Sequence, residues 1–237
     1  DNLGEIFRLT NKNELSLKYF KEQLELSRKA FGNRHPNTSI AYRNIGNVFT
    51  SANDFKKALP YYQKSLISIS KQFDSHSIKN NPSIEDVYTE QELFETLHAK
   101  ALALRKLYSV ESSSKVNLEL SLATYELALR VVDKTRTSLR EENSKFFITE
   151  NLVPVYEEAI DTAVELFNIT GDEKYFEKAF CFTEKNKAVT LLENIKESEA
   201  KIISNLPQTL IEKEKSLKAN ITFNESEKHK ELLKGSK

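Results

Sequence analysis

Apolar residues recur with helical spacing in the first third of the chain. A stripe at i, i+3, i+4 and i+7 predicts a helix that opens at His35-Pro36, because proline suits the first helical turn. Ser51-Ala52-Asn53-Asp54 is a polar turn, in which Asp54 is placed to cap a second helix. The two stripes consist of Tyr42, Ile45, Gly46 and Phe49, followed by Ala58, Tyr62 and Leu66. The pattern predicts an antiparallel pair of helices.

The same pattern occurs twice, 42 residues apart. Asn2-Leu3-Gly4-Glu5-Ile6-Phe7 recurs as Asn44-Ile45-Gly46-Asn47-Val48-Phe49, and Phe20 corresponds to Tyr62. A glycine inside a helix costs roughly 1 kcal/mol relative to alanine. We therefore expect a neighbouring helix to approach Gly46 closely, with Ala58 as the small residue opposite. A repeat of this length is typical of stacked helix pairs.

The second half predicts longer and less regular helices. Two helical faces are separated by a polar loop at Ser109–Lys115, and Asp74–Ser83 is a linker before them. Asn151–Ile169 and Glu173–Ile203 form another pair around Thr170-Gly171-Asp172, in which Gly171 and Asp172 suit the end of one helix and the cap of the next. The two faces are Leu97, Ala101, Leu104 and Tyr108, then Leu122, Tyr125, Ala128, Leu129 and Val132.

A further break is expected at Asn205-Leu206-Pro207. A helix at about Gln208–Phe223 would follow it, amphipathic through Leu210, Leu217 and Ile221, before a polar tail. The predicted fold is all-α, a solenoid of about four helix pairs plus a C-terminal helix. Its expected parts are 1–75 with two helix pairs, the first truncated, 76–203 with two longer and divergent pairs, and 204–237 with the last helix and tail.

Composition narrows the range of functions. The chain has 237 residues with 35 Lys+Arg and 35 Asp+Glu, so its formal net charge is zero. Nucleic-acid binding is not expected, because it favours a basic excess. No apolar run approaches the ~18 residues of a membrane helix, so we expect no membrane contact. One cysteine excludes an internal disulfide and fits a reducing compartment, which favours the cytoplasm. Since the chain begins at Asp1 and holds no Met, we expect part of a longer protein.

The residue types of catalysis are scattered. Cys181 is the only thiol, and none of the four histidines, at 35, 76, 98 and 229, lies near it in sequence. No histidine spacing places two metal ligands on one face, so we expect no metal and no cofactor. Four Asn-x-Ser/Thr sequons, at positions 37, 168, 220 and 224, are interpreted as chance matches. An enzyme active within this chain is the least favoured of three function classes.

The repeated residues resemble the tetratricopeptide repeat (TPR) signature. That signature is carried by Tyr42, Ile45, Gly46, Phe49, Ala58, Tyr62 and Ser65, with Gly4 as the first-repeat counterpart of Gly46; Ser65 departs from the usual alanine. The 42-residue period, with Ala30-Phe31-Gly32 before His35-Pro36, is similar to the repeats of kinesin light chains. The resemblance implies a right-handed superhelix that binds a protein or peptide in a concave groove.

The second half resembles the helical region that precedes a CHAT domain, a caspase-like protease domain of bacterial TPR proteins. The resemblance is carried by Leu122–Leu129, Tyr156–Ile160, Lys178–Ala188 and Leu206-Pro207. It implies a regulatory module in contact with a protease domain outside this chain. A free-standing adaptor, like kinesin light chain, is the alternative.

The resemblance also implies where a ligand would bind. First helices of TPR pairs line the groove, and side chains outside the apolar stripe point into it. Asn2 and Asn44 match the asparagines that bond a peptide backbone, while Arg43 and Asn47 match positions that hold a peptide carboxylate. The groove residues expected here are Asn2, Arg8, Arg43, Asn44, Asn47 and Thr50, with Glu5 and Ser51 beside them.

Overall fold

The computed structural model describes residues 2–111, 115–138 and 152–203, together with single positions between 207 and 224. These residues form α-helices, one 3-10 turn at Ile84–Asp86 and an isolated bridge between Ser70 and Val87, and no β-strand is found among them. The all-α prediction is confirmed. The helices are α1 (Asn2–Leu9), α2 (Asn13–Phe31), α3 (Pro36–Ser51), α4 (Phe55–Ile69), α5 (Glu90–Glu111), α6 (Lys115–Ser138), α8 (Leu152–Thr170) and α9 (Glu173–Ile203).

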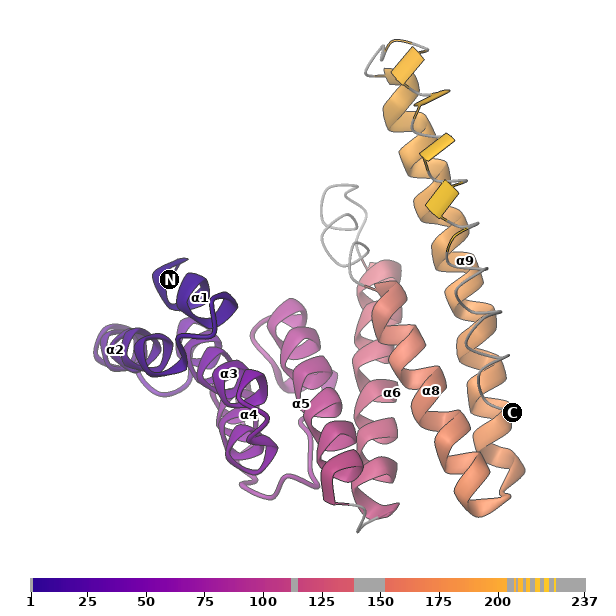
Figure 1. The fold of residues 1–237 in the computed structure, drawn as a ribbon. Coiled ribbons are helices and arrows are strands. Elements are labelled where there is room, and N and C mark those ends of the chain that lie inside the picture. The colour runs from indigo at the N-terminus through magenta and orange to yellow at the C-terminus, as the bar shows by residue number, and fades with distance from the viewer. Residues whose placement is uncertain are drawn as a thin grey trace. The chain divides into compact units, whose positions relative to one another are not determined.

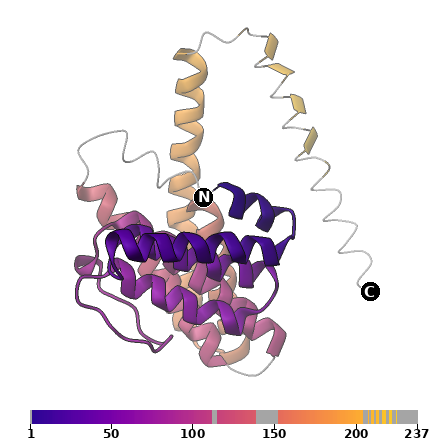
Figure 2. The ribbon, with the colours of Figure 1, turned by 90° about the vertical axis from the view of Figure 1, so that its left-hand side faces the viewer.

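The chain divides into two compact units, Asp1–Val189 and Thr190–Lys237. In the first unit, each helix from α1 to α6 packs against the next one in sequence, and α6 packs against α8. A second set of contacts joins α1 to α3, α3 to α5 and α5 to α8. Figure 1 shows this succession in the order of the colours, and Figure 2 looks onto its α1–α2 end. The first helices of successive pairs are therefore neighbours, as in a solenoid of helix pairs.

The two repeats share a close contact between a glycine and an aromatic ring. A Cβ placed on Gly46 would lie 2.6 Å from Cε1 of Tyr62, and one on Gly4 would lie 2.7 Å from Cε1 of Phe20. The predicted close approach at Gly46 is confirmed. The group opposite it is the Tyr62 ring, whereas the prediction had placed the small residue Ala58 there. Ala58 is fully buried one helical turn earlier in α4.

The predicted helix starts and stops are found. The His35 ring accepts a hydrogen bond from the Asn37 backbone N–H, with Pro36 as the first helical residue. Asp54 accepts one from the Lys57 N–H and caps α4. Gly171 has φ 66°, the left-handed conformation that glycine adopts freely, and the Lys174 N–H donates to Asp172 as α9 begins. These local signals account for the short turns between paired helices.

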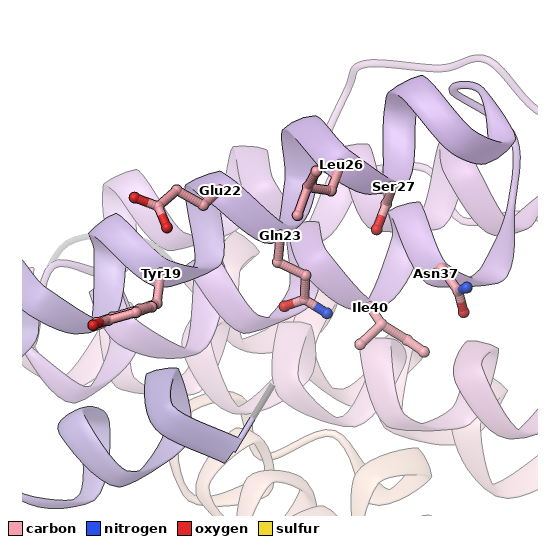
Figure 3. A pocket seen from close by; sticks show the side chains of 7 residues that line it. All are labelled: Tyr19, Glu22, Gln23, Leu26, Ser27, Asn37 and Ile40. Atoms are coloured by element: carbon pink, nitrogen blue, oxygen red, sulfur yellow. The ribbon is translucent and has the colours of Figure 1, made fainter.

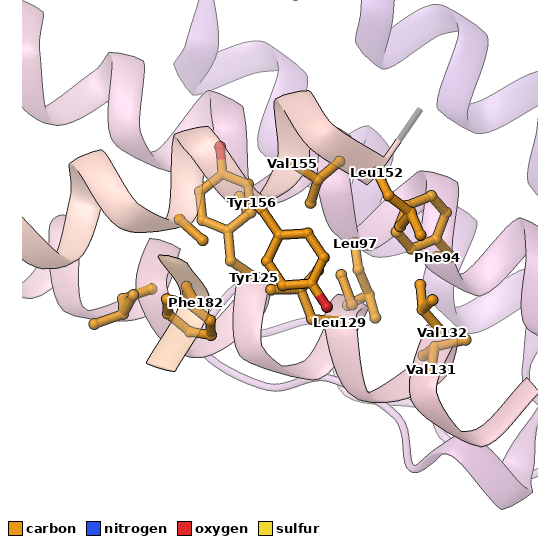
Figure 4. Close-up of a cluster of buried hydrophobic side chains, with 14 of the residues drawn as sticks. Phe94, Leu97, Tyr125, Leu129, Val131, Val132, Leu152, Val155, Tyr156 and Phe182 are labelled. Carbon is orange, nitrogen blue, oxygen red and sulfur yellow. The ribbon is translucent and has the colours of Figure 1, made fainter. Parts of the chain in front are cut away.

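The largest buried cluster fills the second half of the first unit. Leu97 and Tyr125 are fully buried, as are Leu129 and Tyr156 to within 2%. Figure 4 shows these side chains converging from α5, α6 and α8, with Phe182 of α9 beside them. Both predicted apolar faces of this half therefore lie in one core, except that Leu104 joins a second cluster with Tyr62 and Tyr108 stays half-buried at the edge.

One predicted boundary differs from the structure, and another lies outside the described residues. α5 continues to Glu111, so Ser109 and Val110 are helical where a loop was predicted. In this added stretch, which extends the helix by nearly one turn, the Ser109 hydroxyl donates to the Lys106 carbonyl. The expected break at Asn205-Leu206 lies outside the described residues. In the second unit, Leu210, Leu217 and Ile221 are helical and more than half exposed.

Candidate ligand-binding surface

The predicted groove residues lie on the surface where α1, α3, α5 and α8 are neighbours, here called the first-helix face. Arg8 comes from α1, and Arg43, Asn44, Asn47 and Thr50 come from α3. The side chain of Asn2 lies outside the described residues.

Arg43 is held by two glutamates of the next first helix, α5. Its Nε and Nη2 donate to the Glu92 carboxylate at 2.9 and 3.1 Å, and Nη2 lies 2.8 Å from Glu95 Oε2. The side chains of Arg43 and Glu92 are only 16% and 7% exposed. Burial alone would lower the pKa of Arg43, but the Glu92 carboxylate outweighs it and raises that pKa. A ligand carboxylate would therefore have to compete with two carboxylates already in place.

Asn47 and Thr50 hold the Tyr62 hydroxyl. The hydroxyl donates to Asn47 Oδ1 at 2.9 Å and lies 2.8 Å from Thr50 Oγ1. Burial raises the pKa of Tyr62 to about 12, so the phenol stays neutral at physiological pH. Both α3 side chains thereby fix the ring that covers Gly46. Their oxygen atoms contribute to the fold whether or not a ligand is bound.

Arg8 links α1 to α3. Its Nη1 donates to Ser51 Oγ at 3.0 Å, and its Nε donates to Glu5 at 2.8 Å. The pair with Glu5 raises the pKa of Arg8 and lowers the pKa of Glu5. The contact sets the position of α1 beside the C-terminal half of α3.

Asn44 differs from its neighbours on this face. Its side chain is half-exposed and makes no hydrogen bond or ion pair within the described part of the chain. It lies on the same face of α3 as Asn37, Ile40 and Ser51, which precede or follow it at helical spacings of 7, 4 and 7 residues. An amide in this state has both its donor and its acceptor free for a peptide backbone.

Charged pairs continue the first-helix face from α5 to α8. His98 Nε2 lies 2.7 Å from Glu158 Oε2, which also accepts a hydrogen bond from the Tyr125 hydroxyl at 3.0 Å. Burial raises the pKa of Glu158, but the bond to His98 and the other contacts outweigh it and leave that pKa below its ordinary value. Arg105 lies 3.3 Å from Asp161 and 4.0 Å from Glu165. Sequence reasoning missed these residues because they lie outside the 42-residue repeat.

A pocket of about 410 Å³ lies between α2 and the start of α3 (Figure 3). It is lined by Tyr19, Glu22, Gln23, Leu26 and Ser27 of α2 and by Asn37 and Ile40 of α3. The Gln23 amide points toward α3 in this view. Its Oε1 atom is buried and has no hydrogen-bond partner among the described residues. No sequence motif pointed to this pocket.

Lys100 is a fully buried lysine behind this surface. Its Nζ donates to Gln63 Oε1 at 2.7 Å, Asn81 Oδ1 at 2.8 Å and the Asn80 carbonyl at 3.1 Å. Burial lowers the pKa of Lys100 to about 7. Gln63 in turn donates to the carbonyls of Ser75 and Asn80. The predicted Asp74–Ser83 linker is therefore fastened to α4 and α5 by a polar cluster.

The residues considered for catalysis remain apart. Cys181 is exposed in the first third of α9, and His35 caps α3. Within the described residues no three His, Cys, Asp or Glu side chains gather as metal ligands would. The helices in the described ranges also include none with the length and apolarity required to cross a membrane.

Comparisons with known proteins agree with the repeat. Residues 1–66 match the family model described as tetratricopeptide repeat, so this part is a TPR region. TPR regions generally bind other proteins and are typically not enzymes. No curated protein sequence matches the chain.

One solved structure shares the fold, and two others align with much of the chain at lower similarity. BtubC (BKLC) from P. vanneervenii aligns with 81% of this chain at 15% identity and a TM-score of 0.54. The alignment spans 62% of BtubC, which is less than two thirds of its length. Two structures of a proposed kinesin light chain from Podosopora anserina, with nearly identical TPR-like repeats, align with 81% and 78% of this chain and with 93% of their own. Both are 10% identical to it, with TM-scores of 0.32.

Proposed function

We propose that this chain is a protein-binding scaffold whose ligand is a peptide segment lying along the first-helix face beside Asn44. The coarse part of this proposal rests on the TPR region at residues 1–66. The finer part rests on Asn44, because the other described candidates, Arg8, Arg43, Asn47 and Thr50, already have partners within the chain. A free amide flanked by fixed side chains is suited to hold a peptide backbone.

The charged neighbours give the proposed face a rigid frame. Arg43 with Glu92, and Arg105 with Asp161, join successive first helices, so a ligand meets a surface whose spacing is preset. Preset surfaces bind with less loss of conformational entropy. In this proposal Arg43 orders the face and does not bind a ligand carboxylate unless Glu92 and Glu95 are displaced.

The module is further proposed to regulate a CHAT caspase-like protease domain of the same protein, in the cytoplasm and without nucleic acid or membrane contact. The support is the resemblance of about residues 85–223 to the helical region before such domains. Ligand binding near α3 would shift the packing of successive helix pairs and thereby the helices nearest the protease. The alternative is an adaptor with no attached enzyme, which the kinesin-light-chain-like period favours.

Substitution of Asn44 tests the binding proposal. The purified chain and its Asn44→Ala variant would be used to capture proteins from lysate of the source organism at about 150 mM salt. The control is Asn117→Ala, which removes an amide from α6, a helix that is not part of the first-helix face. A protein retained by the parent and the control but lost by Asn44→Ala supports the proposal. Equal retention by all three contradicts it.

The protease proposal needs the full-length protein. A downstream domain with a His and a Cys nucleophile, whose proteolysis changes on ligand addition in the parent but not in Asn44→Ala, would support regulation. A full-length protein without such a domain would leave the adaptor alternative.

A further inference from the structure

A second pocket, of about 350 Å³, lies between α6 and α9. Its lining combines an apolar floor with charged side chains, and consists of Glu126, Leu129, Arg130, Asp133, Phe182 and Lys185. Leu129 and Phe182, which form the floor, belong to the buried cluster shown in Figure 4. The volume lies within the range of about 300–1,000 Å³ that is common for ligand pockets. Because neither α6 nor α9 belongs to the first-helix face, this pocket is separate from the surface beside Asn44.

Arg130 carries a charge that the pocket does not balance. Each carboxylate of the lining is already paired with a lysine of α9. Glu126 is paired with Lys178, and Asp133 with Lys185 at 2.7 Å. Arg130, by contrast, is exposed and makes no hydrogen bond or ion pair with any described residue. These five side chains therefore carry one positive charge in excess, and the guanidinium has its donors free for a carboxylate.

The chain itself shows how a peptide segment contacts α6. In the segment between α4 and α5, the Glu85 carboxylate accepts a hydrogen bond from Lys134 of α6 at 3.0 Å. The preceding residue, Ile84, packs against the buried cluster that also contains Leu129. Lys134 follows Arg130 by four residues, so the two cations are neighbours one helical turn apart. An apolar side chain next to an acidic one is therefore a combination that α6 already binds.

We propose that the pocket between α6 and α9 binds a peptide segment of a partner protein in which an apolar side chain is adjacent to an Asp or Glu. The apolar side chain lies over Leu129 and Phe182, and the carboxylate pairs with Arg130 through two parallel hydrogen bonds. A basic segment is disfavoured because it would meet the excess positive charge. A purely apolar segment is disfavoured because it would cover the guanidinium without pairing it.

Selection from a peptide library tests the proposed class of ligand. A phage library of random linear peptides would be selected on the purified chain, and phage that also bind the Arg130→Glu variant would be removed. This step discards ligands of the surface beside Asn44, so the two proposals are tested separately. We expect the remaining peptides to be enriched in an apolar residue next to Asp or Glu. Enrichment of basic or purely apolar peptides, or no enrichment, would overturn the inference.

Matched variants then test whether the contact is local. For the best peptide, measured by fluorescence anisotropy, Arg130→Glu should raise the Kd by about tenfold or more, because a charge-assisted pair is lost. Lys106→Glu makes the same change in net charge at an exposed position of α5 and should change the Kd by less than about twofold, because distant exposed charges are screened. Replacing the acidic residue of the peptide with Lys should restore part of the binding to Arg130→Glu. Equal losses in the two variants would contradict a local contact.

NMR spectra locate the bound peptide. Addition of the peptide should shift the signals of the Leu129 methyl groups and the Phe182 ring, and should leave the Asn44 side-chain amide unchanged. Circular dichroism should show the same helix content in Arg130→Glu as in the parent, because Arg130 is exposed and has no partner among the described residues. Shifts at Asn44 without shifts at Leu129 and Phe182 would overturn the inference.

Discussion

The ring of Tyr62 occupies the space that a side chain on Gly46 would need, since a Cβ there would lie 2.6 Å from the ring. The ring is held from its other end, because its hydroxyl bonds to Asn47 and Thr50, which follow Gly46 by one and four residues in α3. Helix α3 therefore approaches α4 closely at the one position of its apolar stripe where no side chain intervenes.

Gly46→Ala tests this contact. We expect it to lower the free energy of unfolding by about 1–3 kcal/mol through overpacking, against the gain of roughly 1 kcal/mol that alanine brings to a helix. Urea unfolding followed by circular dichroism measures the change. The double variant Gly46→Ala/Tyr62→Leu should recover part of the loss relative to Tyr62→Leu alone. A neutral or stabilising Gly46→Ala would contradict the contact.

Two arginines of the first-helix face should differ sharply in their effect on stability. Arg43→Met leaves Glu92 buried and without its arginine, which we expect to lower the free energy of unfolding by about 3–5 kcal/mol. Arg105→Met should lower it by less than about 1 kcal/mol, because its partners Asp161 and Glu165 are 63% and 38% exposed. Parallel urea titrations compare the two variants. Equal losses of unfolding free energy in the two variants would contradict the claim that the Arg43–Glu92 pair stabilises the first-helix face.

Lys100 predicts a particular dependence of stability on pH. Its folded-state pKa of about 7 lies below the ordinary value of 10.5, so the unfolded chain holds this proton more tightly between those values. The contribution of Lys100 to the free energy of unfolding should therefore rise as the pH increases from 7 toward 10, by about 2–3 kcal/mol at pH 9. Below pH 7 this contribution should not change with pH. Other groups titrate as well, so the comparison must be made with a variant.

Lys100→Met isolates that contribution. It should lower stability at every pH, because three oxygens lose their donor, and it should also remove the rise between pH 7 and 9. Lys64→Met, at an exposed lysine of α4, should keep the rise. The measurement is the urea midpoint at pH 6, 7, 8 and 9. An unchanged slope in Lys100→Met would contradict a depressed pKa.

Glu158 predicts a second loss of stability with falling pH, in the acid range. Its pKa is depressed by His98, Tyr125 and Arg105, so its contribution is present above about pH 4.3 and is lost as the pH falls through the folded-state pKa. Glu158→Gln should therefore flatten the acid limb of the stability curve. Asp172→Asn, at a surface cap, serves as the comparison, and equal flattening by both would contradict a special role for Glu158.

The sequence was sufficient to predict the repeat, but it did not predict which side chains outside the repeat contact it. Periodicity and the Gly46 position predicted the α3–α4 pair, because a 42-residue offset places equivalent residues in equivalent contacts. The 42-residue offset did not predict that Arg43 pairs with Glu92, 49 residues away, because the linker before α5 interrupts that offset. For the same reason, the repeat did not predict the burial of Lys100 or the contact between His98 and Glu158. The polar run that begins at Ser109 also predicted a loop there, whereas α5 continues to Glu111.

The central claim is that a protein ligand lies on the first-helix face beside Asn44. Site-specific photocrosslinking tests it most directly: p-benzoylphenylalanine would be placed at position 44 and, as the matched control, at position 117 of α6. After irradiation in lysate of the source organism, the account predicts a discrete adduct from position 44 and none of the same mass from position 117. Adducts of equal yield from both positions, or from position 117 alone, would contradict it.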